Sequence, residues 1–327
     1  MGMRKRTLTL RYPKWLEEEL LEVEKRLLPR KERMPPAAWA ALQRVVLNGG
    51  KRLRPALVLL SARLVDVDGE APRATAAAVE LLHTATLIHD DLIDDAPLRR
   101  NVPTLNTLWN PTVAVLVGDL LFARAARLVT ASENLQVVRR FTETLEIICS
   151  GEIHQSFEER GALPTPQAYE ARIYAKTASL FALAAEVGPR LADAAAEEVT
   201  AMWRFGKALG LAFQIVDDVL DFTGDEAQLG KPGGNDLRRG IVTLPVLLYL
   251  DAHPAARPRL QHVLHDGSRA DCDALVADVR RSEALDRALQ IAQDHLHDAL
   301  DILAAYPDSP HRATLEDIAH FAVRRRY

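Results

Sequence analysis

Two short acidic clusters carry the most explicit chemistry in this sequence. The first is Asp90-Asp91-Leu92-Ile93-Asp94 and the second is Asp217-Asp218-Val219-Leu220-Asp221, and each follows an apolar stretch. Residues four apart in a helix are neighbours on one face, so the outer acids of each cluster would lie close together. Like charges so placed repel each other, and the negative end of a helix dipole adds to the cost. Such clusters indicate a bound cation.

The ligand types in the clusters favour Mg²⁺. No His or Cys stands in register with the acids, and oxygen-only ligands are typical of hard cations, Mg²⁺ before Ca²⁺ or Mn²⁺. One such motif alone is about as often a solvated helix end. Two copies, each with apolar residues between the acids, predict acidic rows that line an internal cleft. Facing rows would need several cations with an anion between them, and a diphosphate fits that description.

Basic residues near the clusters could supply the complementary half of a diphosphate site. The segment Gly49-Gly50-Lys51-Arg52-Leu53-Arg54 places two cations beside a glycine turn at a helix start, where backbone N–H groups favour anions. The other basic candidates are Arg99, Arg100, Lys176 beside Thr177, and Lys231. Any one of these would be an ordinary surface cation, but their places beside the clusters favour anion binding. His83, two turns before Asp90, is either a packed residue or a ligand.

The elements that must position these residues are helices. Proline-free spans cover 112–163, 190–231 and 259–306, as long helices require, because a proline inside a helix costs ~3 kcal/mol. Apolar residues recur at helical spacing, and we find no convincing period-2 strand. The sequence therefore predicts an all-α fold with one domain over residues 1–327. Helices are expected at 73–95, 112–130, 134–158, 166–187 and 194–222, and the first and last of these end in the acidic clusters.

Composition excludes several other classes of protein. The net charge of −4 lacks the basic excess of a nucleic-acid-binding protein. No apolar run reaches membrane-spanning length, and the basic N-terminus lacks the apolar core of a signal peptide. Two cysteines, Cys149 and Cys272, are too few for a disulfide framework. We therefore expect a cytoplasmic protein without stable membrane insertion and without a nucleic-acid partner.

Several segments together resemble the trans-isoprenyl diphosphate synthases, in particular the octaprenyl-like polyprenyl diphosphate synthases. The matching segments are GGKRLRP (49–55), ELLHTATLIHDDLIDDAPLRRNVPTLN (80–106), VGDLLFARA (117–125), YAKTASLF (174–181) and GLAFQIVDDVLDFTGDEAQLGKPGGNDLRRGIVTLP (210–245). They occur in the family's order and are highly specific together. The resemblance implies a helical isoprenoid-synthase bundle around a deep central cavity.

The resemblance also implies roles for individual residues. Mg²⁺, about three ions per site, would be held by Asp90, Asp91, Asp94, Asp217, Asp218 and Asp221. The allylic diphosphate would contact Arg99, Lys176, Thr177, Gln214 and Lys231, and isopentenyl diphosphate would contact Lys51, Arg54, His83 and Arg100. Catalysis would rest on Asp90, Asp94, Arg99, Lys176, Asp217 and Lys231. Loss of diphosphate would generate an allylic cation, the isopentenyl double bond would attack it, and a proton would be lost, without a side-chain nucleophile.

Two residues depart from the family pattern. Asn101 stands where many members have glycine, and Ile241 stands where a lysine is common. The second departure removes one expected contact with diphosphate, although Lys176 and Lys231 remain.

Small residues one turn before the first cluster bear on product length. Ala85 and Thr86 would lie roughly 6–8 Å below the metal-binding acids, given a rise of ~1.5 Å per residue. Short-chain members often have an aromatic residue here. Small side chains predict an open tunnel and a heptaprenyl to decaprenyl product, unless Ala85 only packs against a neighbouring helix.

Other readings of the sequence stay open. A short-chain farnesyl or geranylgeranyl diphosphate synthase and a terpene cyclase of the same fold share the acidic motifs, although a cyclase has no need of the isopentenyl site. A subunit of a heteromeric synthase tends to lose the acids, which are intact here, and a Ca²⁺ module would need an EF-hand-type loop. Family members are generally dimers, so we expect a homodimer that joins through helices 112–130 and 134–158.

Overall fold

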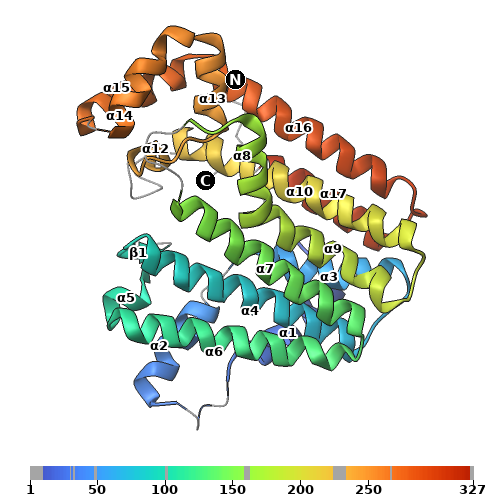
Figure 1. Ribbon diagram of the computed structural model, residues 1–327. Coiled ribbons are helices and arrows are strands. Elements are labelled where there is room, and N and C mark those ends of the chain that lie inside the picture. The colour runs from blue at the N-terminus through green and yellow to red at the C-terminus, as the bar shows by residue number, and fades with distance from the viewer. Residues whose placement is uncertain are drawn as a thin grey trace, which may run out of the picture.

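The computed structural model describes residues 10–29, 31, 34–47, 50–99, 102–157, 163–223, 233–265 and 267–324. Within these ranges the chain is almost entirely helical, which confirms the expected fold class (Figure 1). The described strands are β1 (Leu98–Arg99) and β2 (Val102–Pro103), which form one short antiparallel hairpin. This hairpin directly follows the first acidic cluster.

The five expected helices occur with ends shifted by a few residues. They are α4 (Glu70–Ile93), α6 (Pro111–Val129), α7 (Leu135–Phe157), α8 and α9 (Pro166–Ile173 and Ser179–Leu191), and α10 (Ala196–Thr223). The remaining helices are α1 (Lys14–Leu27), α2 (Pro36–Leu47), α3 (Leu53–Leu64), α5 (Leu105–Leu108), α12 (Asn235–Arg238), α13 (Leu244–Ala252), α14 (Arg257–His265), α15 (Arg269–Arg281), α16 (Ala284–Leu303) and α17 (Pro310–Arg324). The expected helix at 166–187 is interrupted, because one π-helical turn (Tyr174–Ala178) separates α8 from α9.

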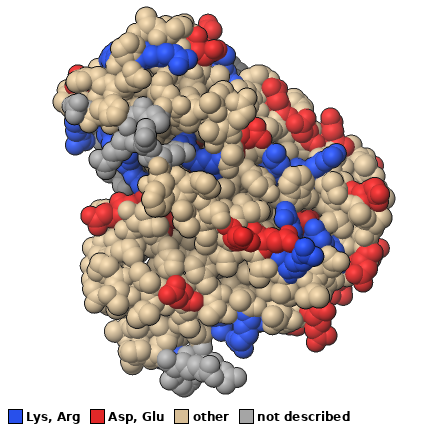
Figure 2. Space-filling view, viewed as in Figure 1, with Lys and Arg blue, Asp and Glu red and all other residues tan. Residues whose placement is uncertain are grey.

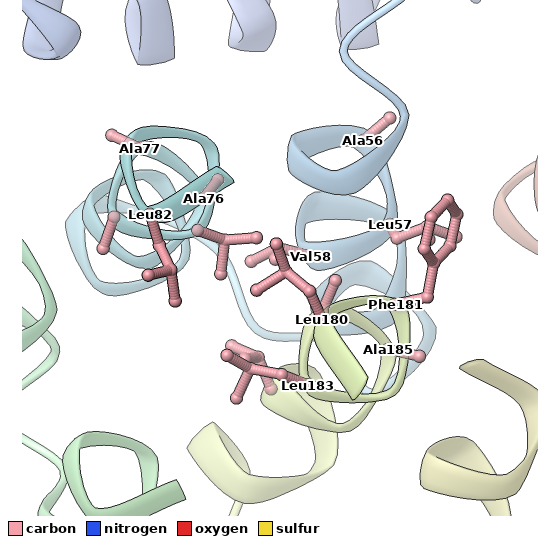
Figure 3. Packing of buried hydrophobic residues seen from close by; sticks show 14 of the residues in the cluster. Ala56, Leu57, Val58, Ala76, Ala77, Leu82, Leu180, Phe181, Leu183 and Ala185 are labelled. Atoms are coloured by element: carbon pink, nitrogen blue, oxygen red, sulfur yellow. The ribbon is translucent and has the colours of Figure 1, made fainter. Parts of the chain in front are cut away.

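The core is built where α3, α4 and α9 meet. Eight consecutive residues of α3, from Pro55 to Ala62, are buried, so this helix is surrounded by protein (Figure 3). Alanines on α4 and α9 let the helices approach closely. A close backbone approach occurs at Gly188 of α9, where an added Cβ would come within 2.2 Å of the carbonyl of Ser61. The core therefore requires a residue without a side chain at this crossing.

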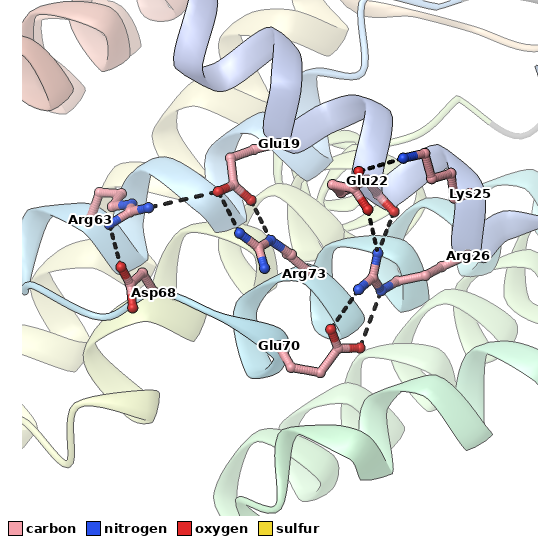
Figure 4. Close-up of polar contacts among 8 residues, drawn as sticks. All are labelled: Glu19, Glu22, Lys25, Arg26, Arg63, Asp68, Glu70 and Arg73. Carbon is pink, nitrogen blue, oxygen red and sulfur yellow. Dashed lines mark hydrogen bonds and ion pairs between the residues drawn. The ribbon is translucent and has the colours of Figure 1, made fainter.

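Helix α1 closes one side of the bundle with an amphipathic face. Leu16, Leu20, Val23 and Leu27, at the helical spacing noted in the sequence, are all buried. Its other face carries ion pairs that reach α3 and α4, with Glu19 bound to Arg73 at 2.5 Å and Arg26 bound to Glu70 at 2.5 Å (Figure 4). An exposed pair such as Arg26 with Glu70 contributes little, whereas the pair of Glu19 with Arg73 is partly buried.

A second apolar cluster lies in the lobe formed by α12 to α15, at the top of Figure 1. Phe222 at the end of α10, Leu250 of α13 and Leu275 of α15 are buried together there. The lobe is thus built directly onto the end of the helix that carries the second acidic cluster. Among the described helices, none is long and apolar enough to cross a membrane.

Candidate active site

The first acidic cluster forms the C-terminal end of α4. Asp91 is buried and accepts a 2.7 Å hydrogen bond from the guanidinium of Arg99 on β1. Asp90 is half-buried, and burial raises its pKa to about 6, opposed by the charge of Lys176. Asp94 follows the last helical residue and is paired with Arg239. Each acid of the cluster therefore faces a cation in the site.

The second cluster lies in the last turns of α10 and is held by a chain of side-chain hydrogen bonds. Thr177 donates to the amide oxygen of Gln214 at 2.6 Å, and Gln214 donates through its nitrogen to Asp218 at 2.8 Å. The hydroxyl of Tyr169 donates to the other oxygen of Asp218 at 2.7 Å. Burial raises the pKa of Asp218 to about 7, although both hydrogen bonds oppose the shift. Asp217 of the same cluster is half-buried.

Asp221 connects α10 to the short helix α12. Its two carboxylate oxygens accept hydrogen bonds from the backbone N–H groups of Asn235 and Asp236, both at 3.1 Å. The carboxylate thereby satisfies donors at the start of α12, which have no partner within the helix. Each oxygen keeps a further lone pair, so metal binding by Asp221 stays a prediction.

A seventh carboxylate joins the site from α12. Burial, together with the charges of Asp221 and Asp218, raises the pKa of Asp236 to about 8. A carboxyl with so high a pKa marks a place where negative charge is crowded and poorly hydrated. A bound cation would relieve that crowding.

Lys176 lies between the two acidic clusters. It is carried by the π-helical turn, a distortion that often occurs at functional sites. Burial would lower the pKa of Lys176, but the carboxylates of Asp90 and Glu152 outweigh it and raise the pKa. Its ammonium group pairs with Glu152 of α7 at 3.3 Å, and its charge also lowers the pKa of Asp236. Lys176 therefore remains a cation that acts on the first cluster and on Asp236 of α12.

A pocket of about 150 Å³ opens beside the first cluster. The predicted isopentenyl-side residues that line it are Lys51, Arg54 and His83, and Asp91 and Arg99 border it as well. Aromatic rings hold two of the cations in place: Lys51 lies 3.8 Å from the ring centroid of Phe321, and Arg54 lies 4.6 Å from that of Phe181. The rest of the lining is largely apolar, and includes Leu87, Ile88 and Phe213. An anion and an alkyl chain would both find partners here.

Arg52, between Lys51 and Arg54 in the sequence, also borders the pocket, but its guanidinium is held by two carboxylates. Its guanidinium binds Glu80 of α4 at 2.6 Å and Glu24 of α1 at 2.9 Å, and its side chain is 10% exposed. The backbone at Arg52 is left-handed, with φ of 47°. The two ion pairs of Arg52 stabilise this unusual backbone conformation. That conformation places Lys51 and Arg54 in the wall of the pocket.

The carboxylates of the site fit Mg²⁺ that keeps part of its coordination shell for water and substrate oxygens. Within the described ranges, no three His, Cys, Asp or Glu side chains converge as in a closed metal site. Mg²⁺ commonly takes only one or two carboxylates from the protein and completes its shell with water and phosphate oxygens. The desolvated acids with raised pKa values, on both sides of Lys176, are suited to that role. Figure 2 shows an indentation at its left edge, below the upper lobe, with acidic side chains on its lower side and basic side chains above.

Several predicted residues lie elsewhere. Arg100, Asn101 and Lys231 are outside the described residues. Ala85 is fully buried within the main core, and Thr86 donates a hydrogen bond to the carbonyl of His83 at 2.8 Å. Neither lines the pocket, so the space around Ala85 is filled by packed neighbours rather than an open channel, and its role in product length stays a prediction.

The sequence reasoning missed four residues of the site: Tyr169, Glu152, Asp236 and Arg239. Asp236 and Arg239 lie within a segment that carries the family resemblance, and their charges shortly before a proline-led helix were the available signal. Tyr169 and Glu152 gave no signal, because each reaches the site only through the packing of its helix.

Comparison with known proteins agrees with this geometry. The family model described as "Polyprenyl synthetase" matches residues 36–280. The chain is 36% identical to heptaprenyl diphosphate synthase component 2 of Geobacillus stearothermophilus over 317 residues, covering 96% of this chain and 98% of the relative. It is also 36% identical to a short chain isoprenyl diphosphate synthase of Methanothermobacter thermautotrophicus, covering 90% and 92%.

A solved structure has the same arrangement of helices. The decaprenyl diphosphate synthase of Rhodobacter capsulatus superposes with a TM-score of 0.86 at 36% identity, and the match covers 96% of this chain and 98% of that one. Family match, sequence identity and fold thus agree over nearly the whole chain. The chain belongs to the polyprenyl synthetase family and is a trans-polyprenyl diphosphate synthase.

Proposed function

We propose that this enzyme condenses isopentenyl diphosphate with an allylic diphosphate in an Mg²⁺-dependent reaction. The observation that carries the proposal is the pocket beside the first acidic cluster, in which Lys51, Arg54 and His83 meet Asp91 and Arg99. A cationic pocket beside desolvated carboxylates suits two diphosphate groups, one bound by side chains and one bound through metal. A terpene cyclase would have no use for the first of these.

The residues divide into two halves. Lys51, Arg54 and His83 bind the isopentenyl diphosphate. Lys176, oriented by Glu152, binds the allylic diphosphate together with the Thr177–Gln214 pair. The two acidic clusters would hold Mg²⁺, which when bound would neutralise the diphosphate and stabilise it as a leaving group. Their ligands would be Asp90, Asp91, Asp94, Asp217, Asp218 and Asp221.

The reaction needs no covalent intermediate with the protein. The allylic C–O bond breaks and its electron pair leaves with diphosphate, and the isopentenyl double bond then forms the new C–C bond. A proton is lost from the adjacent carbon to the departed diphosphate. Leu87, Ile88 and Phe213 exclude water from the cation, and the fixed charge of Lys176 stabilises the leaving group without reorganisation.

We further propose a long-chain product, from heptaprenyl to decaprenyl. Ala85, beneath the first cluster, is a small residue packed against buried neighbours, so a growing chain would pass there only if those neighbours moved apart. The proposal is supported by relatives named heptaprenyl, octaprenyl and decaprenyl diphosphate synthase, and a relative named a short chain synthase supports the competing short-chain product.

The active form is proposed to be a homodimer joined through α6 and α7. Exposed apolar residues lie along these helices, with Leu116 of α6 60% exposed and Phe157 of α7 85% exposed. Figure 2 shows that the face over these helices is largely uncharged. A relative named component 2 makes a heteromer the competing assembly.

The test is incorporation of radiolabelled isopentenyl diphosphate by the purified chain with geranyl or farnesyl diphosphate and Mg²⁺. We expect labelled lipid products from heptaprenyl to decaprenyl, separated by chromatography. Products that stop at geranylgeranyl would contradict the long-chain proposal, and no incorporation by the chain alone would contradict the proposed function of the homodimer.

A further inference from the structure

One arginine connects the upper lobe to the first acidic cluster. Arg239 lies directly after α12, and its guanidinium pairs with the carboxylate of Asp94 at the end of α4. The two residues are 145 positions apart in the chain, and their side chains are 37% and 26% exposed. The pair therefore spans the opening between the two acidic clusters and remains reachable from solvent.

The base of Arg239 is fixed to the second cluster. Asp221 accepts hydrogen bonds from the start of α12, and the N–H of Gly234 donates to the carbonyl of Asp221 at 2.7 Å. At the other end, α12 stops at Arg238, and Gly240, which follows Arg239, adopts a φ of +80° that prevents the helix from continuing. The Arg239 backbone thus moves with the second cluster, while its side chain reaches the first.

The neighbouring arginine serves a different purpose. Arg238 binds Asp273 of α15 at 2.6 Å and the carbonyl of Gly233 at 2.7 Å, so it holds α12 against the lobe. Arg239 instead reaches across to the acid at the end of α4. The two adjacent arginines therefore differ in role: Arg238 binds within the lobe, and Arg239 binds the first acidic cluster.

The residue at position 241 suggests a substrate-binding role for Arg239. The family lysine is absent at this position, and the isoleucine is half-buried, with its backbone N–H bonded to the carbonyl of Asp236 at 2.9 Å. An isoleucine offers no charge to a diphosphate. Arg239, two residues earlier in the same turn, offers a guanidinium, which binds both carboxylate and phosphate oxygens in a bidentate manner.

We propose that Arg239 is a substrate-binding residue that supplies, from a new position, the cation missing at Ile241. It contacts the metal-associated diphosphate of the allylic substrate and passes between that group and Asp94. This inference rests on the proposed function, because it assigns the cation to the allylic half of that site.

The experiment compares Arg239→Ala, Arg239→Gln, Ile241→Lys and the double variant Arg239→Ala/Ile241→Lys with the wild type. Arg287→Ala is the matched control, because Arg287 has a similar exposure and pairs with Asp251 at 3.1 Å, away from the site. Three quantities are measured: KM for farnesyl diphosphate, KM for isopentenyl diphosphate, and Kd for inorganic diphosphate with Mg²⁺ by calorimetry. Thermal unfolding in EDTA reports on the folded state of every variant.

We expect both Arg239 single variants to raise the Kd of diphosphate and the KM of farnesyl diphosphate by about tenfold or more, as loss of a charge-assisted hydrogen bond predicts. KM for isopentenyl diphosphate should stay within about threefold of the wild-type value. In the double variant Arg239→Ala/Ile241→Lys, the Kd of diphosphate and the KM of farnesyl diphosphate should return to within about threefold of the wild-type values. Arg287→Ala should change none of these three constants.

Unchanged Kd and KM in the Arg239 variants, or no rescue by Ile241→Lys in the double variant, would overturn the inference. A lower unfolding temperature with unchanged Kd would assign Arg239 to holding Asp94 alone. If the wild type fails to incorporate isopentenyl diphosphate, the proposed function fails, whereas the diphosphate-binding measurements still decide the role of Arg239.

Discussion

The hydroxyl of Tyr169 donates a 2.7 Å hydrogen bond to Asp218, so α8 holds an acid of the cluster on α10. Tyr169 is 3% exposed and Asp218 is also 3% exposed, so water cannot replace this donor in the folded protein. The orientation of the second cluster thus depends on a residue that lies 49 positions earlier in the chain.

Replacement of this tyrosine should impair both stability and activity. Tyr169→Phe leaves a buried carboxylate oxygen without its donor, which costs about 1–3 kcal/mol of unfolding free energy. We expect kcat to fall by about tenfold, because a poorly oriented Asp218 would bind metal less well. Tyr249→Phe, at a buried tyrosine of α13, is the control, and equal effects in both variants would refute a specific role for Tyr169.

The buried pair of Arg52 and Glu80 should be important for stability. Arg52→Met leaves Glu80 buried without its cation, which typically costs about 3–5 kcal/mol. Denaturant unfolding should show that loss, and the double variant Arg52→Met/Glu80→Leu should recover most of it, because an apolar pair replaces the ion pair. Arg287→Ala, which removes an exposed pair, should cost less than about 1 kcal/mol. A loss no larger than this control in Arg52→Met would contradict the assignment.

The raised pKa of Asp218 predicts a pH-dependent effect on stability. Its folded-state pKa of about 7 lies above the ordinary value of 3.8, so the folded protein holds the proton more tightly than the unfolded chain does. The stability it contributes is therefore complete below about pH 4 and is lost as the pH rises through 7.

Asp218→Asn removes this titration. In EDTA, the unfolding free energy of the variant relative to the wild type should increase by about 2.5 kcal/mol between pH 5 and pH 8, since one pKa unit corresponds to about 1.4 kcal/mol. An offset from altered hydrogen bonds would be the same at every pH. Parallel curves for variant and wild type would show that Asp218 does not titrate in this range.

Much of the fold could be predicted from the sequence, because helix formation depends on residues that are close together in the chain. Helical periodicity and proline placement depend on neighbours within one or two turns, so the expected helices at 73–95 and 194–222 agree closely with α4 and α10. The acidic clusters were visible for the same reason, because the spacing of Asp90 and Asp94 sets their shared face.

The remaining features depend on contacts between distant parts of the chain. Asp221 was expected to bind metal, but its pairing with the start of α12 follows only from how the lobe packs on α10. The pairing of Arg239 with Asp94 could not be inferred from spacing for the same reason. The burial of Ala85 likewise reflects neighbouring helices rather than its own segment.

Product length should respond to bulk at Ala85. Ala85→Tyr adds a phenol ring to a fully buried position below the first cluster, and should shorten the main product while costing about 1–3 kcal/mol from overpacking. Ala77→Tyr, at another fully buried alanine on α4, should cost similar stability without changing product length, because it lies about 20 Å from Asp90 along the helix. An unchanged product distribution in Ala85→Tyr would refute the role of this position.

A site divided into two diphosphate halves can be tested by steady-state incorporation of radiolabelled isopentenyl diphosphate, with each substrate varied in turn. The wild type, Lys51→Ala and Lys176→Ala are compared. We expect incorporation by the wild type that requires Mg²⁺. Lys51→Ala should raise KM mainly for isopentenyl diphosphate, and Lys176→Ala should raise KM mainly for the allylic diphosphate, each by about tenfold or more. No incorporation by the wild type, or the same substrate affected by both variants, would contradict a site divided into two diphosphate halves.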